Sequence, residues 1–108
     1  MSKNPFGNMG NLMKQAQAMQ ERMAKVQEEA PAKTVEASAG GGMVTVTANG
    51  AMQIEKVVID PEVVKADDRE MLQDLLVAAT NEALRKAKDI MAQEVKLITG
   101  GLGIPGMF

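Results

Sequence analysis

The chain offers few side chains that could carry out catalysis. Its 108 residues include no cysteine and no histidine, which excludes disulfides, thiolate nucleophiles, Cys-ligated zinc and most other transition-metal sites. Carboxylates, lysines and hydroxyls remain, but no acid–base pair can be named among them. Asp67, Asp68 and Glu70 are better explained as the cap and first turn of a helix. We therefore expect no catalytic residues, no metal, no cofactor and no enzyme activity.

The stretch "ASAGGGMVTVTANG" at residues 37–50 raises the alternative of a phosphate-binding loop. A Walker-type loop needs Lys and then Ser or Thr directly after its last glycine, whereas Met43 and Val44 follow Gly42. A dinucleotide fingerprint needs glycines that open a helix, and these glycines precede a strand pattern. Residues 40–42 are therefore predicted to form a turn between two strands.

Basic side chains are the remaining groups that could bind a ligand. The net charge is −2, but residues 1–27 sum to +3, residues 28–82 to −7 and residues 83–108 to +2. Basic ends can present a positive field to an anionic partner although the total is negative. Solvated helix faces explain the same pattern, because acidic residues early and basic residues late in a helix complement its dipole.

A first helix is predicted over residues 11–30, with Asn11 as its cap and Pro31 preventing its continuation. Its apolar residues are spaced three and four apart, which is typical of a heptad seam that packs lengthwise on another helix. They are Met9, Leu12, Ala16, Met19, Met23, Val26 and Ala30.

Three strands are predicted next, because the hydrophobic period changes to two from Lys33 onward. They cover residues 33–39, 43–48 and 51–60. Asn49-Gly50 is predicted to form a type I′ hairpin turn between the second and third strands. The alternation of the third strand slips near Glu55-Lys56, which predicts a β-bulge.

A long second helix follows, with a capping box formed by Asp67 and Glu70 at its start and Gly100-Gly101 at its end. Its apolar stripe consists of Leu72, Leu75, Leu76, Ala79, Ala83, Ala87 and Ile90. The fold class is therefore α+β: a helix, a three-stranded antiparallel meander and a long helix, in a single domain over residues 1–99. Residues 100–108 are expected to form a flexible glycine-rich tail.

The predicted helices are longer than the predicted strands, so each helix should overhang the sheet. The apolar seams of the overhanging parts would then be exposed on a monomer. A second copy related by a two-fold axis is the simplest way to cover them, so we expect a homodimer with projecting helices.

The sequence also restricts the location of the protein and, if its anionic partner is a nucleic acid, the kind of nucleic acid that it could bind. It contains neither an apolar run of about 20 residues nor a signal peptide, so a soluble, cytoplasmic protein without membrane contact is expected. Its two aromatic residues, Phe6 and Phe108, give no platform for stacking single-stranded bases. No helix carries the Arg/Asn/Gln cluster of a base reader, so DNA binding would depend on phosphates and duplex shape.

Four motifs together resemble the YbaB/EbfC family of bacterial nucleoid-associated proteins. They are "GNLMKQAQAMQERM" in the first helix, "NGAM" at the hairpin, "VVIDPEVV" after the third strand and "DDREMLQDLLVAATNEALRKAKD" in the second helix, and the ending "GGLGIPGMF" is also similar. The resemblance implies a homodimer that binds double-stranded DNA in the nucleoid and contributes to nucleoid organisation and gene regulation.

The basic residues expected to contact DNA project from the two predicted helices. On the first helix Lys14 and Lys25 lie opposite the apolar seam, with Glu21 between them. On the second helix Arg85, Lys88 and Lys96 lie on the same side, opposite the apolar stripe. The six candidates are Lys14, Arg22, Lys25, Arg85, Lys86 and Lys88.

A protein-interaction clamp or adaptor is the alternative hypothesis. The methionine-rich helices and the acidic middle of the chain would then bind another protein, since methionine surfaces can repack around varied partners. Neutralising the basic residues would abolish function under the DNA-binding hypothesis and leave it largely intact under the adaptor hypothesis.

Overall fold

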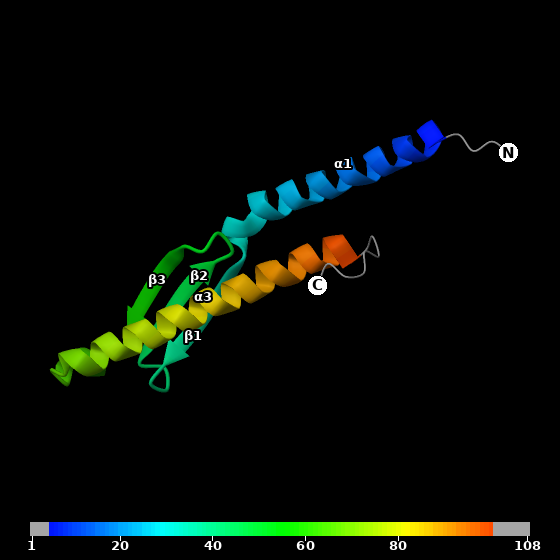
Figure 1. The fold of residues 1–108 in the computed structure, drawn as a ribbon. Helices are drawn as coiled ribbons and strands as arrows, with labels where there is room; N and C mark the ends of the chain where they lie inside the picture. Colours follow the sequence, from blue (N-terminus) through cyan, green and yellow to red (C-terminus); the bar gives the residue numbers. More distant parts are fainter. Residues whose placement is uncertain (1–4, 101–108) are drawn as a thin grey trace.

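The structure is a computed structural model that describes residues 5–100, with side chains described from Met9 onward. Its elements are α1 (Pro5–Glu29), a 3₁₀ turn η1 (Ala30–Ala32), β1 (Thr34–Ala39), β2 (Val44–Asn49), β3 (Ile54–Ile59), α2 (Pro61–Lys65) and α3 (Arg69–Gly100). The strands form one antiparallel sheet in the order β1-β2-β3. The predicted α+β class and the order helix, meander, long helix are confirmed (Figure 1). Most of the predicted tail lies outside the described residues.

The first helix is longer than predicted at its N-terminal end. It begins at Pro5, so Asn11 lies inside the helix and does not cap it. Pro is favoured at the first helical position because its missing N–H has no partner there, and Gly10 costs only about 1 kcal/mol in a helix interior. Pro31 ends the α-helix as expected, since the chain continues as η1.

The glycine stretch forms the turn between β1 and β2, as predicted. Gly40, Gly41 and Gly42 have φ values of 65°, 67° and 98°, in the left-handed region that costs glycine little. The predicted bulge is also confirmed: Thr47 pairs with Lys56 and Ala48 pairs with Ile54, which leaves Glu55 as the extra residue of β3.

The predicted type I′ turn at Asn49-Gly50 is wrong. That turn needs positive φ at both central residues, and in this hairpin only Met52 has it, at 64°. The loop is longer and is organised by a side chain, because Asn49 Oδ1 accepts hydrogen bonds from the N–H groups of Ala51 and Gln53.

The segment predicted as a polar connection contains the short helix α2. Asp60 caps it by accepting a hydrogen bond from the N–H of Glu62, and Pro61 opens its first turn.

The residue that caps α3 is Asp68, one position after the Asp67 of the predicted capping box. Asp68 accepts from the N–H of Met71, whereas Asp67 has φ 53° and leaves α2 in a left-handed conformation.

The core lies between α3 and one face of the sheet. Val44, Val46 and Ala48 of β2 are fully buried, as the alternating pattern predicts. The α3 residues that complete the cluster are all alanines: Ala79, Ala83 and Ala87. Leucines of the predicted stripe flank these alanines and are half-buried. Small side chains at the centre let α3 approach the sheet closely, and the leucines pack along the sides of this contact.

The helices overhang the sheet, as predicted. The molecule measures 79 × 25 × 16 Å, and its radius of gyration is 21.3 Å, against about 13 Å for a compact chain of this length. The N-terminal part of α1 and the C-terminal part of α3 extend in the same direction from the sheet (Figure 1). We call α1 and residues 88–100 of α3 the arms.

Only part of the predicted seam of α1 is covered by α3. Met19, Met23 and Val26 are half-buried, and Ile98 of α3 is buried beside Met19. Met9 and Leu12 are 54% and 63% exposed, because they lie beyond the part of α1 that runs along α3.

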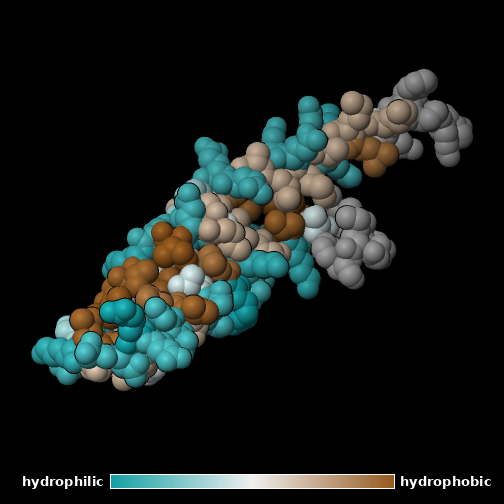
Figure 2. Space-filling view, turned by 60° about the vertical axis from the view of Figure 1, so that its left-hand side comes forward, coloured by the Kyte–Doolittle hydropathy of each residue, from teal (hydrophilic) through white to brown (hydrophobic). Residues whose placement is uncertain are grey.

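A row of apolar residues on β3 is only partly covered. Ile54, Val57 and Ile59 pair with the three buried residues of β2 and so share the face that α3 packs on. However, α3 packs on β1 and β2 and hardly reaches β3. Ile54 and Val57 are therefore 40% and 42% exposed. We call this row the β3 face; Figure 2 shows hydrophobic side chains over the sheet half of the molecule.

Candidate nucleic-acid interface

The three candidate cations of α1 are exposed and free of ion pairs within the described part of the chain. Lys14 and Lys25 are eleven residues apart, which places them on the same side of the helix and about 16 Å apart along it. Arg22 lies to one side and borders a small gap of 140 Å³ next to Ile98 of α3. Its stem therefore faces the other arm, and its charge lies near the space between the two arms.

Arg85 of α3 is held by two neighbouring carboxylates. Its Nη1 donates to Asp89 Oδ2 at 2.8 Å and its Nε donates to Glu82 Oε2 at 3.1 Å, while its Nη2 donates to the second oxygen of Glu82. The hydrogen bond to Glu82 raises the pKa of Arg85, and the same bond lowers the pKa of Glu82. A phosphate would have to compete with both carboxylates for this guanidinium.

Lys86 contacts the sheet instead of projecting from the molecule. Its Nζ donates to the backbone carbonyl of Glu36 at 3.0 Å. Glu36 belongs to β1, an edge strand, so Lys86 satisfies one of the open carbonyl groups of that edge. This contact gives Lys86 a structural role.

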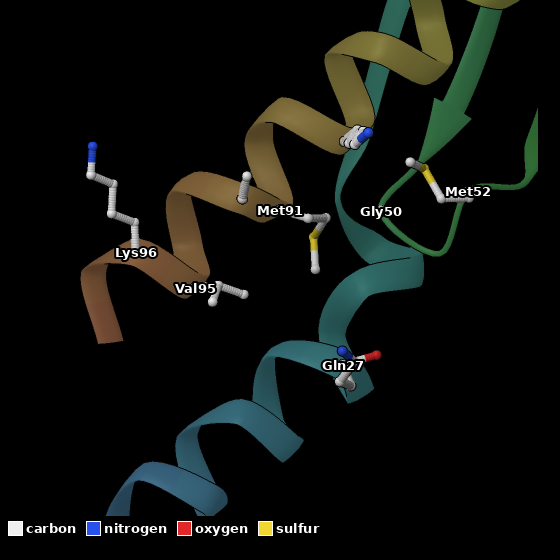
Figure 3. A pocket seen from close by; sticks show the side chains of 8 residues that line it. Gln27, Gly50, Met52, Met91, Val95 and Lys96 are labelled. Carbon is white, nitrogen blue, oxygen red and sulfur yellow. The ribbon is translucent and has the colours of Figure 1, made fainter. Parts of the chain in front are cut away.

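Lys88 borders an apolar hollow at the junction of the arms and the sheet. The hollow has a volume of 560 Å³, and Met52, Met91, Ala92 and Val95 contribute its apolar side chains. Met91 reaches into it from α3, between Gly50 and the end of α1 at Gln27, whereas the head of Lys96 points away (Figure 3). Within residues 9–100, neither Lys88 nor Lys96 forms an ion pair.

The structure thus separates the six candidates into two groups. Arg85 and Lys86 are engaged by other groups of the same chain. The others are exposed on the arms without an ion pair among the described residues: Lys14, Arg22, Lys25 and Lys88. Lys96 joins this second group, although it is not among the six candidates.

Charge is distributed along the long axis of the molecule. From residue 9 onward the arms carry five basic and five acidic side chains, and two of the acidic ones, Glu28 and Glu29, lie where α1 meets the sheet. Residues 60–74, which form α2 and the start of α3 at the opposite end, carry six acidic and two basic side chains. The charges of the arms therefore balance, and an anion would be repelled much less by the arms than by the acidic end at residues 60–74.

Sequence patterns did not identify two features of the junction between the arms and the sheet. Lys33 Nζ lies 3.0 Å from Glu94 Oε1, so the residue after η1 is joined to α3. Asn49 is 2% exposed and forms hydrogen bonds through both side-chain atoms. Glu94 is 61 residues from Lys33, and no local pattern predicts a pairing over that distance.

Among residues 5–100 no cluster of His, Cys, Asp or Glu is arranged to hold a metal ion. Nor does any of the described helices have an apolar stretch that could cross a bilayer.

The family comparison covers nearly the whole chain. The model of the YbaB/EbfC DNA-binding family matches residues 6–102. This family is a group of DNA-binding proteins and is not a class of enzymes.

Similar proteins from several bacteria carry the name nucleoid-associated protein. One from Acetivibrio thermocellus is 62% identical over 103 residues, which cover 94% of this chain and 91% of the relative. Another from Clostridium novyi is 57% identical and covers 94% of this chain and 89% of the relative.

A solved structure shares the fold. The crystal structure of the uncharacterized protein HP0035 from Helicobacter pylori aligns with a TM-score of 0.61 and 23% identity, covering 72% of this chain and 90% of that protein. At this identity the likeness concerns the fold alone.

Proposed function

The chain belongs to the YbaB/EbfC DNA-binding family, and from this premise we propose that it binds double-stranded DNA as a homodimer, mainly through phosphate contacts made by the arms. The observation that carries this proposal is the position of the unpaired cations. They lie on helices that project beyond the sheet, whereas six acidic residues cluster at the opposite end, at residues 60–74. Two such arms can approach a duplex without bringing the acidic end near it.

The proposed mode of binding is phosphate contact and recognition of duplex shape. Lys and Arg neutralise phosphates and release counterions, which makes affinity fall steeply with salt. The unpaired cations of the arms are Lys14, Arg22, Lys25, Lys88 and Lys96. Four of the five are lysines, whose compact charge binds phosphate as a point charge. Sequence preference should therefore be modest.

The homodimer is supported by the β3 face. A three-stranded sheet with a partly covered apolar row and an open edge is marginal by itself. The hollow next to Met52 and Met91 is apolar too. A second copy packed on the β3 face would cover Ile54, Val57 and Ile59, and two pairs of arms would then project from a shared core.

The biological role that we propose is nucleoid organisation with an effect on gene regulation, in the cytoplasm at the nucleoid. The names of the similar proteins support this role. The comparisons favour DNA over a protein partner, so the adaptor hypothesis is the weaker one.

The test is a fluorescence-anisotropy titration of a labelled duplex of about 30 base pairs at several salt concentrations. The logarithm of the affinity should fall linearly with the logarithm of the salt concentration. Replacing Lys14, Arg22 and Lys25 together by Gln should reduce the slope by about three for each protomer whose arms contact the duplex, roughly one for each phosphate that is no longer neutralised.

A matched control removes the same charge from the other end of the molecule. Lys56, Lys65 and Arg69 are also exposed, and replacing them by Gln lowers the net charge by the same amount. This variant should keep the slope of the unmodified protein. Equal reductions of the slope in both variants would show that only net charge matters, and absence of duplex binding at low salt would refute the proposal.

A further inference from the structure

The loop between β2 and β3 reaches the junction at which the chain leaves α1 and enters the sheet. The N–H of Gly50 donates to the carbonyl of Ala30 at 3.0 Å and to that of Lys33 at 2.9 Å. Ala30 begins η1 and Lys33 follows it. The N–H of Gly50 therefore bonds to carbonyl groups at both ends of η1, the turn that sets the direction of α1.

Only glycine fits at position 50 without displacing this junction. A Cβ there would lie 2.5 Å from Met91 Sδ and 2.9 Å from the carbonyl oxygen of Ala30. The methionine side chain could rotate away, but the carbonyl oxygen could move only with η1. Gly50 does not have a positive φ, so the requirement is close approach and not an unusual backbone conformation. Figure 3 shows the side chain of Met91 extending from α3 into the space between Gly50 and the end of α1.

Asn49 fixes the shape of this loop. Its Oδ1 accepts hydrogen bonds from the N–H groups of Ala51 at 2.9 Å and Gln53 at 3.2 Å. Its Nδ2 donates to Glu55 Oε2 at 2.8 Å and to Gln53 Oε1 at 3.2 Å. A buried amide with all these partners holds a single conformation, since any other would leave buried polar groups unpaired.

A second tie joins the junction to the other arm. Lys33 Nζ lies 3.0 Å from Glu94 Oε1, and the hydrogen bond to Glu94 raises the pKa of Lys33. Glu94 lies in the projecting part of α3, so this pair links the end of η1 to that arm.

We propose that the Asn49-Gly50 loop and the Lys33–Glu94 pair are positioning elements that set the angle between α1 and α3, and with it the fit of the arms to DNA. This inference rests on the proposed function. Because α1 is about 37 Å long, a tilt of about 10° at the junction moves its far end by roughly 6 Å. That displacement exceeds the axial rise of about 3.4 Å between phosphates of one strand, so small changes at the junction change which phosphates the arms can reach.

The inference can be tested without DNA, because the chain has no cysteine. Spin labels attached to Gln17→Cys on α1 and Gln93→Cys on α3 report the distance between the arms by pulsed electron spin resonance. Dilution with unlabelled protein restricts the signal to distances within one chain. Gly50→Ala and, separately, Lys33→Gln should shift or broaden the distance distribution. Lys65→Gln, which removes the exposed pair with Glu62 far from the junction, should leave it unchanged.

The exchanged pair Lys33→Glu with Glu94→Lys provides a rescue. It restores the attraction with the charges reversed and should return the distribution toward that of the unmodified protein, which a loss of folding would not do. If Gly50→Ala does not fold, Lys33→Gln and the exchanged pair still give the answer.

Duplex affinity is then measured on the same proteins. Gly50→Ala and Lys33→Gln should lower it by about tenfold at fixed salt, as expected when one or two phosphates move out of reach of the arms. Unchanged distance distributions in both variants would overturn the inference whether or not the protein binds DNA. Changed distances with unchanged affinity would overturn the link to DNA. If the unmodified protein does not bind the duplex, the proposed function fails, and the distances alone decide the positioning role.

Discussion

At the scale of residues, contacts within the chain decide which cations are available to a ligand. Lys88 and Arg85 are one turn apart on α3, yet only Arg85 is held by carboxylates on the same helix. A surface ion pair contributes little to stability, but it occupies the donors that would bind a phosphate. Helix periodicity gives both residues similar positions and cannot distinguish them.

This difference predicts that two single substitutions have different effects on the salt dependence of DNA binding. Lys88→Gln should reduce the salt slope of DNA binding by about one for each protomer that contacts the duplex, because it removes an unpaired cation that we propose to bind phosphate. Arg85→Gln should leave the slope unchanged and lower the affinity only slightly, through the weaker field. Anisotropy titrations at several salt concentrations measure both quantities, and a larger slope change for Arg85→Gln would contradict the assignment.

The Glu82–Arg85 contact also predicts a dependence of stability on pH. The hydrogen bond from Arg85 lowers the pKa of Glu82 below its ordinary value of 4.5. A depressed carboxylate pKa stabilises the fold above the unfolded-state pKa, and this contribution is lost as the pH falls through the folded-state value. Urea unfolding between pH 7 and pH 3 should therefore show a smaller loss of stability for Glu82→Gln than for the unmodified protein. Glu70→Gln, which removes another exposed carboxylate of α3, serves as control.

At the scale of elements, α3 is joined to the sheet by its smallest side chains. Ala79 and Ala83 are fully buried and Ala87 is 1% exposed, so the helix backbone lies close to β1 and β2. Their spacing of four residues places them on one line along the helix. The stripe predicted from sequence contained these alanines, but only the packing shows that they are its buried centre.

We expect a large residue at this centre to disrupt the packing. Ala83→Leu should destabilise the protein by about 1–3 kcal/mol, because the added atoms have no space and must push the helix away from the sheet. Ala78→Leu adds the same atoms at an exposed position of the same helix and should be nearly neutral. Denaturant midpoints at constant m-value compare the two, and equal midpoints would show that the core is looser than described.

At the scale of the whole molecule, the elongated shape and the partly covered β3 face belong together. A chain that extends 79 Å cannot bury all of its apolar residues against itself. The exposed row of β3 lies beside the helix that covers the other two strands. In the proposed homodimer a second copy covers this surface, and the arms stay free on the outside.

This arrangement predicts that one charge on the β3 face separates the dimer. Val57→Glu places a carboxylate in the apolar row and should yield a monomer, because burying an unpaired charge is costly. Val58→Glu introduces the same charge at the neighbouring residue, whose side chain lies on the other face of the sheet and pairs with Thr45; this variant should remain a dimer. Sedimentation velocity over a range of concentrations distinguishes them. A monomeric unmodified protein, or two variants with the same behaviour, would contradict this role of the β3 face.

The sequence by itself determined the features that depend on local spacing. The alternating Val and Thr residues of β2, the three glycines of the first turn and the slipped alternation at Glu55 predicted the sheet and its bulge correctly. These signals are readable because each arises from the backbone conformation of a few neighbouring residues. The long helices were equally clear from their apolar periodicity, although the start of α1 and the cap of α3 were misplaced.

The tertiary structure alone decided how these elements are joined and which side chains remain free. Asn49-Gly50 has the sequence of a tight hairpin turn, but Asn49 organises a longer loop through its own side chain. The N–H of Gly50 then bonds to the carbonyl of Ala30, which is distant in the sequence. The pair Lys33–Glu94 and the contact of Lys86 with β1 likewise join residues far apart along the chain. Local patterns carry no information about such contacts, because they form only when helix, loop and sheet have packed together.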